Sequence, residues 1–110
     1  ALDRPGNDLS EAYVETMIRR CHGSTARAGV AIGELIAELD VAPELAALDL
    51  PVLVVHGTHD TSGPFELTGR RAAALAPNST LEVYEDAGHG LFATHADRLT
   101  CDLRKFAAGE

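Results

Sequence analysis

The chain has 110 residues, of which 45% are hydrophobic, which is enough for one compact domain and too few for two. Its 17 acidic and 9 basic side chains give a formal net charge of -8, which opposes binding to nucleic-acid phosphates and to anionic membrane surfaces. We therefore expect neither nucleic acid nor a membrane as a partner.

We also expect no segment that directs the chain into a membrane or out of the cell. No apolar run approaches the ~20 residues needed to span a bilayer, and residues 1–5 do not begin a signal peptide. Cys21 and Cys101 lie far apart without CxxC spacing, which argues against a zinc ribbon or a redox motif. We predict a soluble, cytoplasmic chain. Because the sequence has no initiator methionine, we also expect a fragment of a longer protein.

Two helices are predicted at the start of the chain. Asp8 and Glu11 have the spacing of a capping box, and apolar residues then recur at helical intervals as far as a glycine. Ser24 can cap a second helix, which runs to Asp40 and has one apolar face. The residues of that face are Ala28, Ile32, Leu35, Ile36 and Leu39. A helical hairpin is therefore predicted within residues 1–46.

Strands and helices alternate in the rest of the chain. After a short helix over 43–48, four consecutive apolar residues, followed by His56, predict a strand over 52–56 that is buried on both faces. Pro64 can then start a helix that runs to about Leu75. The first strand is therefore predicted to lie inside a sheet.

The second strand has a different pattern. Leu81 and Val83 alternate with Thr80, Glu82 and Tyr84, which predicts a half-exposed strand near a sheet edge. Thr94, with Asp97 three residues later, can cap a final helix. The inward residues of that helix are predicted to be Ala96, Leu99, Leu103 and Phe106.

The predicted order of elements, ααβαβα, indicates an α/β fold with parallel strands and helices on the faces of the sheet. Two strands do not complete such a sheet, because a strand of the apolar 52–56 type keeps an open hydrogen-bonding edge. The sequence therefore predicts that this segment, 47–110, pairs with strands from elsewhere.

Candidate chemistry lies in the loops that follow the two strands. Ligands of open parallel sheets bind at the carboxyl ends of the strands. Asp60 follows the first strand and His89 follows the second, so neighbouring strands would bring an acid and an imidazole to one edge. Such a pair is the orienting half of a catalytic triad, in which the acid fixes the tautomer of the histidine. Both residue types are also common in loops as turn and capping residues, and that alternative stays open.

Several stretches resemble the C-terminal part of the α/β-hydrolases, and most closely the cofactor-free haloperoxidases, also described as perhydrolases or arylesterases. They are Leu50-Pro51-Val52-Leu53-Val54-Val55-His56-Gly57-Thr58-His59-Asp60, Pro64-Phe65, Gly69-Arg70-Arg71, Tyr84-Glu85-Asp86-Ala87-Gly88-His89-Gly90-Leu91 and Thr94-His95-Ala96. The resemblance spans roughly residues 47 to 108. It implies that Asp60 is the triad acid and His89 the general base that activates a serine in acyl transfer. It also implies that no cofactor is needed and that 1–46 contains the end of a helical cap over the active site.

One departure from that family concerns the nucleophile. The G-x-S-x-G motif of the fold is absent from these residues, and Ser10, Ser24, Ser62 and Ser79 all lie outside any such motif. The 110-residue chain alone is therefore predicted to be inactive, with the nucleophile supplied by an N-terminal portion outside this sequence.

Two functions are weighed on these grounds. The first is ester hydrolysis, with perhydrolysis or haloperoxidase activity as a side reaction, on a small ester or acyl substrate. The second is a truncated, non-catalytic domain that dimerises or binds a partner through its open sheet edge. His56 and His59 have H-x-x-H spacing, but they do not have the helical spacing of a zincin, and we predict no metal site.

Overall fold

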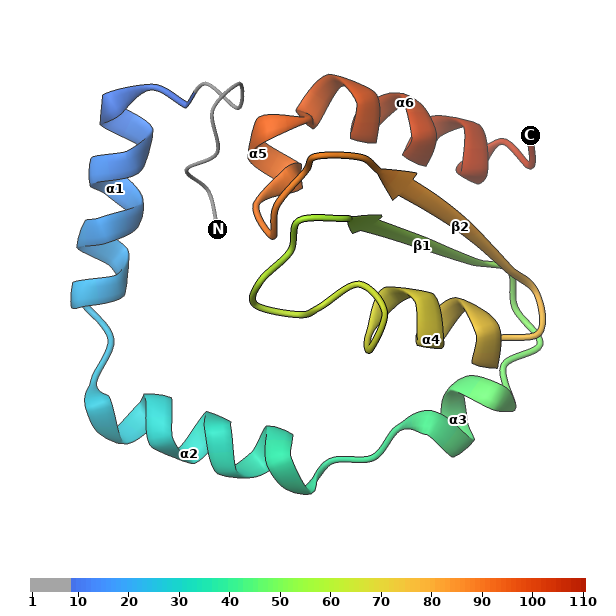
Figure 1. The fold of residues 1–110 in the computed structure, drawn as a ribbon, viewed down its shortest axis with the longest axis horizontal. Coiled ribbons are helices and arrows are strands. Elements are labelled where there is room, and N and C mark those ends of the chain that lie inside the picture. Colours follow the sequence, from blue (N-terminus) through green and yellow to red (C-terminus); the bar gives the residue numbers. More distant parts are fainter. Residues whose placement is uncertain (1–8) are drawn as a thin grey trace. The chain divides into compact units, whose positions relative to one another are not determined.

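The computed structural model describes residues 9–110, which divide into two compact units, Leu9–Val41 and Ala42–Glu110. The first unit consists of the helices α1 (Glu11–His22) and α2 (Ala26–Glu38) (Figure 1). Each helix begins at a hydroxyl side chain that accepts a hydrogen bond from an orphan backbone N–H. Ser10 accepts from the N–H of Tyr13 at 3.2 Å, and Thr25 accepts from the N–H of Ala28 at 3.1 Å.

The helix caps differ in part from the prediction. The cap of α2 is Thr25 and not Ser24, because Thr25 has the extended backbone, with φ −85° and ψ 146°, that an N-cap requires. The predicted cap at Asp8 lies outside the described residues, and Ser10 is the N-cap of α1. The second helix also ends at Glu38, before the predicted Asp40. Ser24 and Thr25 both have a hydroxyl that can cap a helix, and the backbone conformation selects Thr25.

The predicted apolar face of α2 is exposed. Ile32, Leu35, Ile36 and Leu39 are 57%, 62%, 64% and 60% exposed, respectively. Two short helices have too little surface to bury such a face between them. Within its described residues the Leu9–Val41 unit therefore has no buried core.

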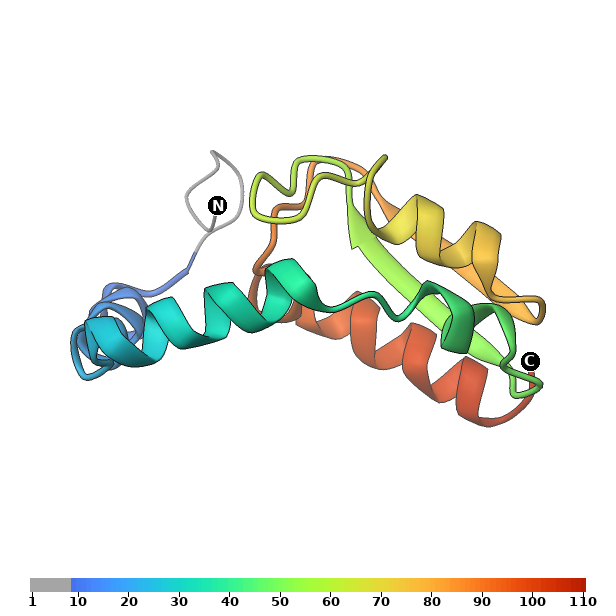
Figure 2. The ribbon, with the colours of Figure 1, turned by 90° about the horizontal axis from the view of Figure 1, so that it is seen from below.

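The Ala42–Glu110 unit is built on two parallel strands. Its elements are α3 (Ala42–Ala46), β1 (Val52–Gly57), α4 (Gly69–Leu75), β2 (Ser79–Tyr84), α5 (Leu91–Thr94) and α6 (Ala96–Ala107). The strands pair in register from Val52 opposite Ser79 to Gly57 opposite Tyr84. Figures 1 and 2 show α4 and α6 on opposite sides of this pair. The predicted α/β arrangement with parallel strands is present, with α5 as an additional short helix.

Three predicted details of this unit are wrong. The strand β1 is half-buried and not buried on both faces, because each strand has only one hydrogen-bonded neighbour among the described residues. The helix α4 starts at Gly69 and not at Pro64, because the chain first makes a turn in which Thr68 Oγ1 donates to the carbonyl of Pro64 at 2.9 Å. The capping residue of α6 is His95 and not Thr94.

The packing of α6 also differs from the prediction. Leu99 and Phe106 are half-buried, but Ala96 is exposed and Leu103 is 49% exposed. The half-buried residues of the helix are Leu99, Asp102 and Phe106, and Asp102 accepts a hydrogen bond from the hydroxyl of Tyr84 at the end of β2. A hydrogen bond and part of the predicted apolar face therefore orient α6 together.

Tyr84, predicted on the exposed face of β2, is fully buried. Its hydroxyl donates to Asp102 at 2.5 Å, and the guanidinium of Arg98 lies 3.7 Å from the centre of its ring. The ring of His95 lies 5.8 Å away, centre to centre. Burial, followed by the hydrogen bond to Asp102, raises the pKa of Tyr84 to about 12. Alternation failed here because Tyr84 is the last strand residue, where α6 covers it.

We predict that Tyr84→Phe lowers the free energy of unfolding by about 1–3 kcal/mol, because it removes a buried donor from a charged acceptor. Urea denaturation followed by circular dichroism measures this change. Tyr13→Phe removes a hydroxyl from a half-exposed tyrosine of α1 and serves as the control. Equal stability of the two variants would contradict a stabilising contact between Tyr84 and Asp102.

Candidate active site

The two loops that follow the strands lie side by side and are joined by backbone hydrogen bonds. The N–H of Thr58 donates to the carbonyl of Tyr84, and the N–H of His59 donates to the carbonyl of Ala87, both at 3.0 Å. A Cβ atom at Gly57 would collide with the carbonyl of Ala87, so this close approach requires glycine. The parallel pairing of β1 and β2 thus continues into the loops and brings them together.

The structure brings Asp60 and His89 into direct contact. Oδ2 of Asp60 lies 2.8 Å from Nδ1 of His89. The carboxylate can only accept, so Nδ1 carries the hydrogen and Nε2 is the ring nitrogen that can take up a proton. The Asp60 side chain is 7% exposed and that of His89 is 60% exposed. A buried acid therefore orients a histidine that solvent, or a second group, can reach.

Backbone donors hold the other oxygen of the Asp60 carboxylate. Oδ1 accepts from the N–H groups of Ser62 and Gly63, both at 2.9 Å. Burial by itself would raise the pKa of Asp60, but the hydrogen bonds from Gly63, His89 and Ser62 together outweigh it and hold the pKa below its ordinary value. The acid is therefore ionised at neutral pH and can stabilise an imidazolium at His89.

His56 is a site residue whose role the sequence analysis missed. It was weighed only as a metal ligand with His59, whereas its Nε2 lies 2.9 Å from the carbonyl of Gly63 and 3.3 Å from Oδ2 of Asp60. The signal in the sequence was a polar residue at the end of an otherwise apolar strand, four positions before the acid.

His59, in the loop after β1, lies near a different carboxylate. His59 Nδ1 lies 3.3 Å from Oδ1 of Asp86, without hydrogen-bond geometry to any described residue. Asp86 has a left-handed backbone with φ 63°, and its N–H donates to Thr58 Oγ1 at 3.0 Å. His56 and His59 thus face different partners, despite their H-x-x-H spacing.

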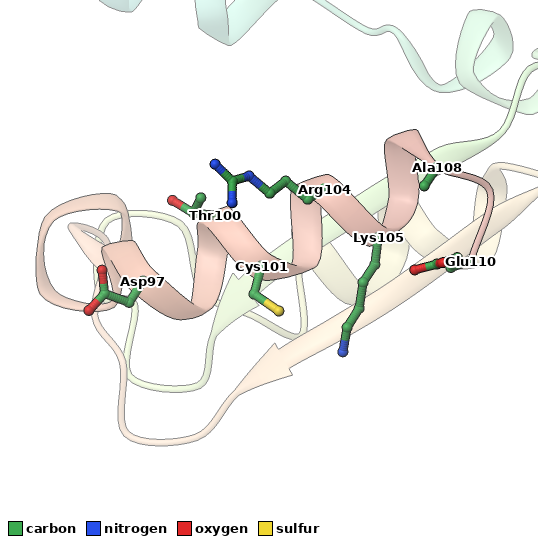
Figure 3. Close-up of a pocket in the computed structure, with 7 residues that line it drawn as sticks. All are labelled: Asp97, Thr100, Cys101, Arg104, Lys105, Ala108 and Glu110. Carbon is green, nitrogen blue, oxygen red and sulfur yellow. The ribbon is translucent and has the colours of Figure 1, made fainter.

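A hollow elsewhere on the unit does not provide a second site. It runs along α6 and is lined by Asp97, Thr100, Cys101, Arg104, Lys105, Ala108 and Glu110. Figure 3 shows that Arg104 and Lys105 point away from the helix in different directions, so the charged groups do not converge on one point. Because Asp60 and His89 are not among the lining residues, the chemistry does not lie in this hollow.

The chain is similar to known haloperoxidases and esterases. The chain is 32% identical over 98 residues to a non-heme chloroperoxidase of Kitasatospora aureofaciens, covering 89% of the chain and 36% of that protein. It is 31% identical over 105 residues to a non-heme haloperoxidase of Rhodococcus erythropolis, covering 96% of the chain and 38% of that protein. It is 32% identical over 105 residues to a bifunctional esterase/perhydrolase of Acinetobacter calcoaceticus, with the same coverage. No protein-family model matches the chain.

Solved structures agree with these relatives. A bromoperoxidase of Bacillus anthracis matches with a TM-score of 0.61 and 33% identity, over 64% of this chain and 25% of that one. An esterase of a Rhodococcus species matches with a TM-score of 0.58 and 33% identity, over 61% of this chain and 24% of that one. The fold of the chain is therefore part of an α/β-hydrolase fold. The chain is similar to the non-heme haloperoxidases, and it spans a little over a third of the length of the curated relatives it matches.

No helix among residues 9–110 is long and apolar enough to cross a membrane.

Acidification is predicted to destabilise the fold through Asp60. Because its folded pKa lies below the ordinary value of 3.8, the native contacts of the carboxylate stabilise the fold above that pH. This contribution is lost as the pH falls through the lower, folded pKa. Urea denaturation at several pH values from about 2 to 6 should show that Asp60→Asn removes this part of the pH dependence. Asp97→Asn, on the exposed surface of α6, should keep it.

The start of α4 is predicted to require glycine. A Cβ atom at Gly69 would collide with the imidazole of His56, so Gly69→Ala should lower the free energy of unfolding by about 1–3 kcal/mol. The matched control is Gly63→Ala in the same unit, whose Cβ would make only ordinary contacts, the nearest at 3.6 Å to Thr68. If thermal denaturation showed the two variants to be equally stable, the packing of His56 against Gly69 would be refuted.

Proposed function

We propose that Asp60 and His89 are the acid and the general base of a Ser-His-Asp triad that hydrolyses small esters. The hydrogen bond of 2.8 Å between them carries this proposal. Support comes from the low pKa of Asp60, the exposure of His89 and the relatives named as esterase, perhydrolase and haloperoxidase. The serine nucleophile would come from polypeptide outside the 110 residues, because no G-x-S-x-G motif occurs in them.

In this mechanism His89 moves the protons. Its Nε2 takes the proton of the serine hydroxyl as the serine oxygen attacks the ester carbonyl, and Asp60 stabilises the imidazolium that forms. The imidazolium then gives this proton to the leaving alkoxide, which departs as an alcohol and leaves an acyl-serine. A water molecule, deprotonated in turn by His89, attacks the acyl carbon, and the imidazolium returns the proton to the serine oxygen as the carboxylic acid is released. Hydrogen peroxide in place of that water would release a peracid, which is the proposed perhydrolysis side reaction.

The organisation of the chain follows from the same proposal. Residues 47–110 would be the C-terminal segment of the catalytic core, and residues 1–46 would contain the end of a helical cap. The exposed apolar face of α2 supports a covering role, because such a face is stable in water only when it packs against something else. A cytoplasmic location and the absence of a cofactor also remain predictions.

The test uses the natural gene product that contains this sequence. Its intact mass defines its length, and p-nitrophenyl acetate hydrolysis with and without a serine-directed phosphonate defines its chemistry. Asp60→Asn and His89→Ala should each lower kcat by about 10³- to 10⁴-fold, as loss of a triad member does. The exposed substitutions Asp97→Asn and His22→Ala are matched controls that should retain turnover.

Near-normal turnover in Asp60→Asn or His89→Ala would overturn the triad. A natural product of 110 residues without turnover would instead favour the non-catalytic function, in which the open edges of β1 and β2 pair with a second copy or a partner. Analytical ultracentrifugation of that product would then show whether it self-associates.

A further inference from the structure

We propose that His56 is a positioning residue for Asp60, which holds the acid-bearing loop in place by donating a hydrogen bond to the backbone of Gly63. The inference rests on the proposed function, because it adds a residue that orients the acid of the proposed triad. His56 does not itself contact His89 in this assignment. Its effect on catalysis would pass through the loop from Gly57 to Gly63.

Gly63 is held at both of its backbone polar groups. Its N–H donates to Oδ1 of Asp60 and its carbonyl lies 2.9 Å from Nε2 of His56, so the glycine connects the two side chains. Nε2 of His56 also lies 3.3 Å from Oδ2 of Asp60, the oxygen that binds His89. The loop is thereby closed back onto the last residues of β1.

The chemistry of these neighbours fixes the tautomer of His56. A carbonyl oxygen and a carboxylate oxygen can only accept hydrogen bonds, so Nε2 must carry the hydrogen. Its N–H is directed to Gly63, with the carboxylate of Asp60 as the nearby second acceptor. A donor at this one ring position is therefore the property that the loop needs.

Packing prevents the ring of His56 from turning away. Its side chain is 14% exposed, and its ring centre lies 5.6 Å from that of Phe65. On the Nδ1 side the ring lies against Gly69, where a Cβ atom would collide with it. A ring fixed by the start of α4 can transmit that fixed position to Gly63 and so to Asp60.

The loss of this donor would displace the acid. Without it the carbonyl of Gly63 keeps only the longer hydrogen bond from Thr68 Oγ1, at 3.2 Å, and is no longer tied to β1. We therefore expect the N–H groups of Ser62 and Gly63 to lose their alignment with Oδ1 of Asp60. Oδ2 would then no longer be held at 2.8 Å from His89. A misplacement of about 1 Å in a catalytic constellation is enough to lower turnover by about 10²-fold.

The experiment compares the wild-type form of the natural gene product that contains this sequence with its His56→Phe and His56→Gln variants by NMR. Phenylalanine keeps a ring and removes the donor, whereas glutamine places an amide N–H near the position of the imidazole Nε2. Long-range ¹⁵N–¹H correlation of the wild-type chain should show His56 as the Nε2–H tautomer. A ¹³C titration of the Asp60 carboxyl should show its pKa rising towards 3.8 in His56→Phe and staying low in His56→Gln.

The matched control is His95→Phe, which replaces a half-buried histidine that packs on Tyr84 and not on the acid loop. Its Asp60 titration should equal that of the wild type. The proposal is overturned if wild-type His56 is the Nδ1–H tautomer, or if Asp60 titrates normally in His56→Phe, or if His56→Gln raises the Asp60 pKa. The first and third of these results do not depend on His56→Phe folding.

Activity of the natural gene product separates this inference from the proposed function. In that protein, His56→Phe should lower kcat/KM by about ten- to hundredfold, mostly through kcat, whereas His56→Gln should retain most of the wild-type kcat/KM. Full activity of His56→Phe together with an inactive Asp60→Asn would overturn the role of His56 and leave the triad intact. Full activity of Asp60→Asn, with the expected NMR shift in His56→Phe, would overturn the triad and leave the contact as a structural one.

Discussion

Parallel pairing of β1 with β2 positions everything else in the Ala42–Glu110 unit. Because the register runs from Val52 opposite Ser79 to Gly57 opposite Tyr84, both strands end at the same level and their loops leave the sheet together. The absence of a side chain at Gly57 lets the backbone near Ala87 approach and extend the pairing beyond the strands. The backbone of the two loops therefore places Asp60 of one loop next to His89 of the other.

The carboxylate of Asp60 is the most closely held group of the candidate site. Its burial is unfavourable for a charge, and this cost is offset by two backbone donors on one oxygen and by His89 on the other. Those donors also leave Oδ2 available to the two imidazoles, with His89 Nδ1 at 2.8 Å and His56 Nε2 at 3.3 Å. Stability of the loop and orientation of the histidine therefore depend on the same hydrogen bonds.

A second polar cluster, centred on Tyr84, fixes α6 to the end of β2. The hydroxyl of Tyr84 binds Asp102, and Arg98 lies over its ring and donates to the carbonyl of Val83 at 3.2 Å. In a unit with few buried apolar side chains, such contacts replace part of the core that a larger sheet would supply. The loop with His89 lies between Tyr84 and α6 in the chain, so this cluster also anchors both of its ends.

Local patterns in the sequence were sufficient for much of this description. Apolar runs and alternation predicted both strands, the parallel α/β arrangement, and the loops that carry Asp60 and His89, because strand period and turn residues are properties of neighbouring positions. Contacts that periodicity does not encode decided the rest. Tyr84 is buried because α6 returns over it, α4 starts late because the turn at Thr68 intervenes, and His56 meets Gly63 only after the loop closes. Periodicity carries no information about such contacts, since they depend on which surfaces the folded chain brings together.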